Sequence, residues 1–272
     1  MGFAICIASA HIFTLHLNFN PSIGENPISS ITIYVLIVIF VATLIRSTFG
    51  FGEALIAVPL LSLRIPLRTA APLAVLVSIA VAAVIIGQDW RKIHMRSAGG
   101  LVASTVFGIP LGLVLLTSVH QDTLKAALAV FVIAFAVYAL SGRQLPELRS
   151  ENRIWLFTCG FCAGVLGGAY GMNGPPLAIY GGIRRWSPEH FRATLQGYFL
   201  PASLLGMLGY LFAGLWTFTV TRYFLLSLPV IIPTILLGRA CNRRLQGAAF
   251  HRLVYLVVAV SGIVLLVQAA HQ

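Results

Sequence analysis

Two glycine-rich stretches interrupt the apolar regions of this chain. The first covers residues 49–53 and the second covers residues 167–176, and a short apolar segment follows each of them. Such a break at membrane depth leaves backbone N–H and C=O groups unpaired, so it must line protein or a water-filled cavity. A helix that begins after the break presents free N–H groups and the positive end of its dipole, which together favour anions. The two breaks therefore predict a binding site for a small anion.

Two ionisable residues accompany the first break. Arg46 lies at the end of the preceding apolar segment, and Glu53 lies at the end of the break. A charged side chain at membrane depth is costly and is a functional candidate by default. The Arg46 guanidinium could hold an oxyanion through two parallel hydrogen bonds, pair with Glu53, or extend to the membrane interface. Glu53 could carry a coupling proton or cap the short helix that follows.

The second break supplies neutral polar groups. Tyr170 and Asn173 offer a phenol and an amide to an anion, while Asn173 equally fits a cap for a helix that begins at Pro175. Gln196 lies early in the next apolar span, where hydrogen bonding between helices is the alternative role. The candidate substrate-binding residues are Arg46, Gly50, Gly52, Glu53, Tyr170, Gly171, Asn173, Gly174 and Gln196.

Other patterns in the sequence indicate packing rather than chemistry. Cys159 and Cys162 form a C-x-x-C pair in an apolar segment, with no second pair that would suggest a redox site. Gly160, Gly164 and Gly168 recur at every fourth residue, which predicts close helix packing. The sequence has no H-E-x-x-H, P-loop, G-x-S-x-G or Cys/His metal motif. We therefore expect no catalytic residue, no metal site and no cofactor.

The composition sets the class of protein that must position these residues. The chain is 58% hydrophobic and only 9% charged, against roughly 25% charged residues in a soluble domain. Most of its surface must therefore face lipid, which predicts an all-α integral membrane protein. The net charge of +11 comes from basic residues in short gaps between apolar segments, without a basic stripe interleaved with aromatics. We therefore expect no nucleic-acid partner.

The apolar segments predict how the chain crosses the bilayer. A membrane helix needs roughly 20 apolar residues. On that basis we expect about eight full spans and two short half-helices, one after each glycine-rich break. The full spans are predicted at 31–48, 68–87, 97–118, 121–140, 153–167, 192–213, 222–239 and 252–269, and the short pieces at 54–63 and 175–183.

The order of segments repeats along the chain. A long span, a glycine break, a short piece, a proline-containing loop and three further spans occur twice, with Phe49-Gly50 matching Tyr170-Gly171. This order predicts two internal repeats. The expected organisation is an N-terminal apolar segment and external linker at 1–30, a first repeat at 31–140, a cytoplasmic linker at 141–152 and a second repeat at 153–269. Residues 1–17 fit either an extra helix or a cleaved signal segment.

The loop charges predict the orientation of the two repeats. Most of the 18 Lys and Arg residues lie in four loops, at 88–96, 141–153, 184–192 and 239–252. Basic residues accumulate on the cytoplasmic side, so these loops are expected inside. The counterpart of the first loop, at 214–221, has no Lys or Arg. Equivalent loops thus differ in charge, which predicts inverted repeats like those of many secondary transporters.

The two breaks also carry a resemblance to a known family. The segments from Phe49 to Leu61 and from Gly164 to Leu177 are similar to the paired motif G-[FIL]-G-G-G, followed by an apolar run with proline. In these motifs the chain resembles the sulfite exporter TauE/SafE family, also called the toluene-sulfonate uptake permease family. Glu53 and Asn173 stand where that pattern has glycines.

The resemblance implies a carrier in the inner membrane of a bacterium. Members of the family move sulfite, organosulfonates and related anions, so we expect a multi-pass secondary transporter for a sulfur-containing or organic anion. The expected partners are that anion, the lipid bilayer and a coupling ion, either a proton or sodium. The rival interpretations are an anion channel, a membrane enzyme, or an assembly subunit that transports nothing.

Overall fold

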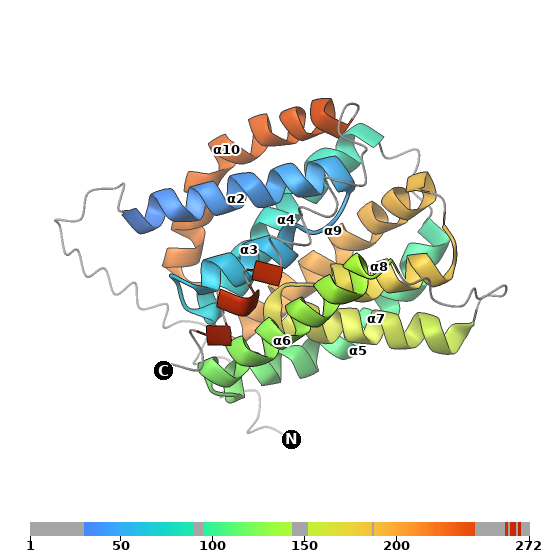
Figure 1. Ribbon diagram of the computed structural model, residues 1–272, viewed down its shortest axis with the longest axis horizontal. Helices are drawn as coiled ribbons and strands as arrows, with labels where there is room; N and C mark the ends of the chain where they lie inside the picture. Colours follow the sequence, from blue (N-terminus) through green and yellow to red (C-terminus); the bar gives the residue numbers. More distant parts are fainter. Residues whose placement is uncertain are drawn as a thin grey trace, which may run out of the picture.

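The described part of the chain is built from helices and contains no strand (Figure 1). This computed structural model describes residues 30–89, 95–142, 152–186 and 188–242, with short helical pieces at 259–260, 262–264 and 266–267. The helices are α2 (Ser30–Phe49), α3 (Glu53–Ser62), α4 (Leu67–Asp89), α5 (Met95–Ser118), α6 (Gln121–Leu140), α7 (Arg153–Tyr170), α8 (Gly174–Ile183), α9 (Pro188–Phe212) and α10 (Phe218–Asn242). Residues 1–29 of the predicted segment at 1–30 and most of the predicted linker at 141–152 lie outside the described residues.

Six of the described helices are long and apolar enough to cross a membrane. They are α2, α4, α5, α6, α9 and α10, and they confirm six of the predicted spans. The segment predicted at 153–167 does form a helix, α7, but this helix is not among the six. It has 18 residues, begins at Arg153 and is rich in glycine, which lowers its mean hydropathy. The span predicted at 252–269 falls largely outside the described residues, so the total of about eight is not confirmed.

The two short helices form where the sequence predicts them. Helices α3 and α8 have 10 residues each. The chain reaches each of them through glycines with positive φ, which are Gly50 and Gly52 before α3 and Gly171 before α8. At Gly171 a Cβ would also lie 2.8 Å from the carbonyl oxygen of Ala71 on α4. Only glycine therefore allows the chain to turn there without strain.

The helices pack mainly across the two halves of the chain. Helix α10 lies along α2, as Figure 1 shows at the top of the view, and α5 lies along α7. Between α5 and α7 the backbones approach so closely that a Cβ on Gly164 would lie 2.4 Å from the carbonyl oxygen of Thr105. Small residues allow this contact between membrane helices. The close packing predicted for Gly160, Gly164 and Gly168 is confirmed.

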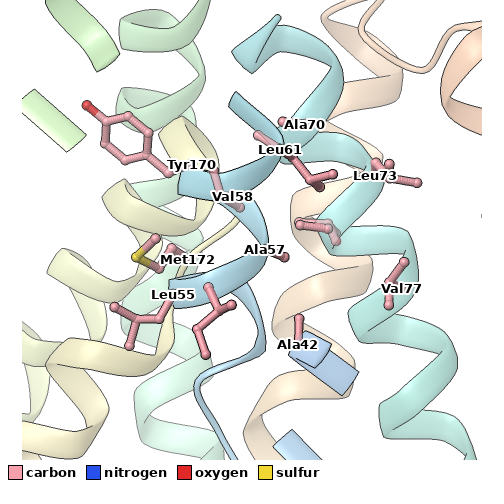
Figure 2. Packing of buried hydrophobic residues seen from close by; sticks show 14 of the residues in the cluster. Ala42, Leu55, Ala57, Val58, Leu61, Ala70, Leu73, Val77, Tyr170 and Met172 are labelled. Carbon is pink, nitrogen blue, oxygen red and sulfur yellow. The ribbon is translucent and has the colours of Figure 1, made fainter. Parts of the chain in front are cut away.

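An apolar cluster holds α3 in place (Figure 2). Leu55, Val58 and Leu61 of α3 are almost fully buried. Their neighbours in the cluster come from α2, α4 and the second break, and include Ala42, Ala70, Leu73, Val77 and Met172. Since α3 packs against α2 and α4, its first turn is fixed beside the end of α2. The packing therefore positions the first break and does not merely bury apolar area.

Candidate functional site

The two glycine-rich breaks meet at one pocket. Its space is about 20 Å³, counted as the volume open to the centre of a water molecule, which is roughly room for one or two waters. The pocket brings together six of the nine candidate residues. These are Arg46, Gly52, Glu53, Gly171, Asn173 and Gly174. The remaining lining residues are Phe51, Ala54, Leu55, Ser78, Met172, Pro175 and Phe199.

Arg46 and Glu53 form a buried ion pair in the pocket. Arg46 is 2% exposed and Glu53 is 3% exposed. Arg46 Nη1 donates to Glu53 Oε2 and also to Ser78 Oγ, the latter at 2.6 Å. A buried pair of this kind must regain a large cost of desolvation. Of the alternatives for Arg46, the pairing with Glu53 is therefore present, and the extension to the membrane interface is wrong because the side chain is buried.

One edge of the Arg46 guanidinium is left unpaired, and we call it the open edge. Its nitrogens Nε and Nη2 are buried, and within the described residues they have no hydrogen-bond partner. These two nitrogens form the side of the planar fork that binds two oxygens of one oxyanion in parallel. A buried donor without a partner costs about 1–3 kcal/mol, and more when it is charged. The open edge is therefore what a pocket built for an oxyanion would leave.

The orientation of this guanidinium is fixed from two further sides. The Cζ atom of Arg46 lies 4.8 Å from the centroid of the Phe199 ring on α9, a cation–π contact. Ser78, on α4, lies 3.3 Å from Ser203 Oγ on α9. Helices α4 and α9 pack against each other, so the contacts of Arg46 come from both halves of the chain.

The N-termini of the short helices contribute unequally. The first turn of α3 lines the pocket with Glu53, Ala54 and Leu55, and the N–H groups of a first turn have no partner within the helix. Helix α8 begins with Pro175 and Pro176 directly after Gly174, and proline has no N–H group. The free N–H groups expected at the start of each short helix are therefore fewer in α8 than in α3. Helix α8 offers its dipole and fewer donors, while α3 offers both.

Asn173 lies at the N-cap position of α8 but does not act as a side-chain cap there. Instead it hydrogen-bonds Tyr198, whose hydroxyl lies 2.7 Å from Thr105 Oγ1. A Cβ on Gly167 would lie 3.2 Å from the Asn173 amide. The capping alternative is thus wrong, and the amide is held at the pocket wall from α7 and α9. Glu53 likewise makes no cap, because Gly52 is the N-cap of α3 and no side chain caps that helix.

The other three candidates do not line the pocket. The Tyr170 hydroxyl donates to the carbonyl oxygen of Leu124 on α6 at 3.2 Å, and Figure 2 shows its ring turned away from Met172. Gln196 Nε2 donates to the carbonyl oxygen of Gly50 at 3.3 Å. This contact joins α9 to the first break and not to another helix, so it differs from the hydrogen bond between helices that was the alternative role. Gln196 Oε1 has no partner in the described part of the chain.

Several residues of the pocket were not predicted from the sequence. Ser78 is a polar residue within an apolar span, which is a signal that could have found it. Phe51 and Met172 lie within the two breaks and could have been included with them. Phe199 carries no such signal, because an aromatic residue in an apolar span is common in any membrane helix. Its contact with Arg46 depends on how two distant helices cross.

Comparison with known families gives a match. The family described as "Sulfite exporter TauE/SafE" matches residues 35–265, which is most of the chain. No curated protein matches significantly, and no solved structure does.

Proposed function

The chain belongs to the sulfite exporter TauE/SafE family, and from that premise we propose that it is a secondary transporter that binds a small sulfur oxyanion at Arg46. Membership makes it a multi-pass membrane protein of a family that transports sulfur anions. We place it in the inner membrane of a bacterium. The observation that carries the proposed site is the open Nε and Nη2 edge of Arg46 between the two breaks.

The pocket fits the chemistry of a sulfite or sulfonate group. Two oxygens of such a group match the spacing of the open guanidinium edge. A third oxygen can accept from the free N–H groups in the first turn of α3, where the helix dipole also favours negative charge. The organic part of a sulfonate would lie against Phe51, Met172 and Phe199, which line the same pocket.

The size of the pocket supports a moving carrier. A sulfonate group needs more room than one or two waters, so the conformation described must widen before it binds one. The lining also includes large apolar side chains, such as those of Leu55, Met172 and Phe199, whereas a channel would need a continuous polar path. Alternating access at a site between two repeats provides the widening.

The contacts between the halves support two inverted repeats, 31–140 and 153–269. The first break is held by Gln196 of α9 through Gly50, and the second break lies against Ala71 of α4 through Gly171. These contacts are reciprocal. Each break thus contacts the helix that follows the short helix of the other half, as a two-fold relation between the repeats would give.

Counterflow in liposomes tests the proposed function. Purified protein is reconstituted into vesicles loaded with unlabelled methanesulfonate or sulfite, and the uptake of a trace of the same labelled anion is followed. A carrier exchanges the two, so the label accumulates transiently and the initial rate saturates with concentration. Protein-free vesicles provide the background.

Two results would contradict the proposal. Flux that does not saturate and carries current would indicate an anion channel. The absence of anion flux from well-folded, reconstituted protein would indicate a membrane enzyme or an assembly subunit.

A further inference from the structure

We propose that Glu53 is the binding site of a co-transported proton, so that one monoanion and one proton occupy the pocket together. This inference rests on the proposed function, because it takes the anion to bind at Arg46. It adds the coupling ion, the residue that holds it and the charge of the preferred substrate.

Glu53 is placed to sense an anion in the pocket. Its side chain lines the pocket, and Oε2 accepts from Arg46. In the described part of the chain, Oε1 has no hydrogen-bond partner. Among the residues that line the pocket, Arg46 and Glu53 are the only ionisable ones. The other described ionisable groups near α3, on the elements packed against it or around the apolar cluster that holds it, lie outside the lining. They are Tyr34, Arg64, Arg68, Asp122, Lys125, Tyr138, Tyr170, Tyr210, Arg222 and Tyr223.

The charge balance of the pocket links the anion to a proton. With both side chains ionised, the empty pocket is neutral. An anion that binds at the open edge of Arg46 would give the buried site a net negative charge, beside a carboxylate of like sign. A like charge nearby favours the protonated form of a carboxyl group. A proton taken by Glu53 from the solvent on the open side restores neutrality, and it also makes Oε1 or Oε2 a donor.

This charge balance predicts in which states the pocket can change its access from one side of the membrane to the other. The empty pocket with a charged pair and the loaded pocket with a protonated Glu53 are both neutral. A pocket that holds only the anion or only the proton carries a net charge, which is costly in a low dielectric. The neutral states therefore interconvert more easily between the two sides. The result is an electroneutral symport of a proton with a monoanion.

The same geometry disfavours sodium as the coupling ion. A sodium ion at Glu53 would lie within contact distance of the Arg46 guanidinium, which repels it. It would also need several oxygen ligands, and the polar side chains of the lining other than the ion pair are only Ser78 and Asn173. A proton needs just one carboxylate oxygen.

Uptake driven by a pH gradient tests the proposal. Labelled methanesulfonate is the probe, since it stays ionised over the working pH range and its own protonation cannot mimic coupling. The probe is added outside the proteoliposomes, where the pH is acidic in both conditions. The inside is either less acidic than the outside or at the same acidic pH. The readout is the ratio of the two initial rates, which corrects for differences in exchange rate between variants. The variants are Glu53→Gln and a control, Asp122→Asn, which removes an acid of α6 outside the pocket.

The wild type and Asp122→Asn should accumulate the probe in response to the gradient, and Glu53→Gln should lose this response. The proposal is overturned if the wild type shows counterflow but no response to the pH gradient, if Glu53→Gln responds as the wild type does, or if a sodium gradient drives uptake instead. A wild type without counterflow at any pH would refute the carrier itself, and would thus be distinguishable from a failure of coupling alone.

If the Glu53→Gln protein does not exchange the anion at all, a binding measurement tests the proposal instead. Calorimetry of methanesulfonate binding in buffers of different ionisation enthalpy counts the protons taken up. By reciprocal linkage, the wild type should take up about one proton per bound anion, and so should Glu53→Asp, which keeps a carboxyl group. A wild-type uptake of zero protons would overturn the proposal without any variant.

Discussion

At the residue scale, the site depends on how the three nitrogens of the Arg46 guanidinium are used. Nη1 is bound by Glu53 and Ser78, while Nε and Nη2 have no partner in the described part of the chain. Of the three roles that the sequence left open for Arg46, the pairing with Glu53 is present. This pairing occupies one nitrogen and leaves the edge at which we propose that the oxyanion binds. The neighbours of Arg46 then decide whether that edge points into the pocket.

Ser78 should act as a positioning residue for this edge. Its hydroxyl accepts from Nη1 at 2.6 Å, so Ser78→Ala frees the guanidinium to turn. The lost hydrogen bond is worth about 1 kcal/mol, which corresponds to roughly fivefold weaker anion binding. The change in affinity is measured by titrating the purified protein with methanesulfonate and recording its melting temperature at each concentration.

A matched control for this variant is Ser104→Ala on α5. The Ser104 hydroxyl donates to the carbonyl oxygen of Gly100 within the same helix, away from the pocket. Ser104→Ala should bind the anion as the wild type does, and Ser78→Thr should restore most of the affinity. Equal affinities in Ser78→Ala and the wild type would show that Ser78 does not position Arg46.

At the element scale, the glycines have two separate functions. Gly50, Gly52 and Gly171 adopt positive φ where helices end or begin at the two breaks. Gly160, Gly164 and Gly168 instead allow α7 to approach α5. The glycines of α7 should therefore control the stability of the protein, and the glycines with positive φ should control the shape of the site.

The packing of α5 on α7 predicts the effect of Gly164→Ala. The new Cβ would lie 2.4 Å from the Thr105 carbonyl oxygen and 3.0 Å from Gly108 Cα, and backbone atoms cannot move aside easily. Overpacking of this kind costs about 1–3 kcal/mol, so the melting temperature in detergent should fall clearly. Gly87→Ala on α4 is the control, because no atom lies within 4 Å of its new Cβ. A Gly164→Ala protein as stable as Gly87→Ala would contradict the close packing.

The sequence predicted the elements better than their contacts. Helix length and hydropathy located α2, α4, α5, α6, α9 and α10, and the glycine breaks located α3 and α8. These features are local, so periodicity and composition reveal them. The contact of Arg46 with Phe199, the placement of Ser78 and the turn of Tyr170 toward Leu124 depend on how distant helices cross. Composition carries no information about such crossings.

At the scale of the whole molecule, the reciprocal contacts of the two breaks bring the halves together around one site. Each break is held by a helix of the other half, through Gln196 on α9 and Ala71 on α4. The repeated order of elements predicted the two halves. The two breaks were also expected to form one site, but the order of elements could not show that the pairing of α4 with α9 brings them together.

Inverted repeats predict opposite sides for the ends of α3 and α8. In a protein whose cysteines are replaced, Arg64→Cys and Gly182→Cys each introduce one thiol, at an exposed position after α3 and in the last turn of α8. A membrane-impermeant thiol reagent should label Arg64→Cys from outside intact cells and Gly182→Cys only after permeabilisation. Both should be labelled in detergent. Labelling of both from the same side would refute the inversion.

The most direct test of the account is the anion affinity of Arg46→Lys. Lysine keeps the positive charge beside Glu53 but lacks the planar fork, so the variant separates the fork from simple charge attraction. Loss of charge-assisted hydrogen bonds worth about 1.5–3 kcal/mol predicts methanesulfonate binding weaker by roughly tenfold to a hundredfold. Arg64→Lys, an exposed arginine whose guanidinium lies 5.9 Å from the Tyr34 ring centroid, should bind as the wild type does. Wild-type affinity in Arg46→Lys would contradict an oxyanion site at the guanidinium of Arg46.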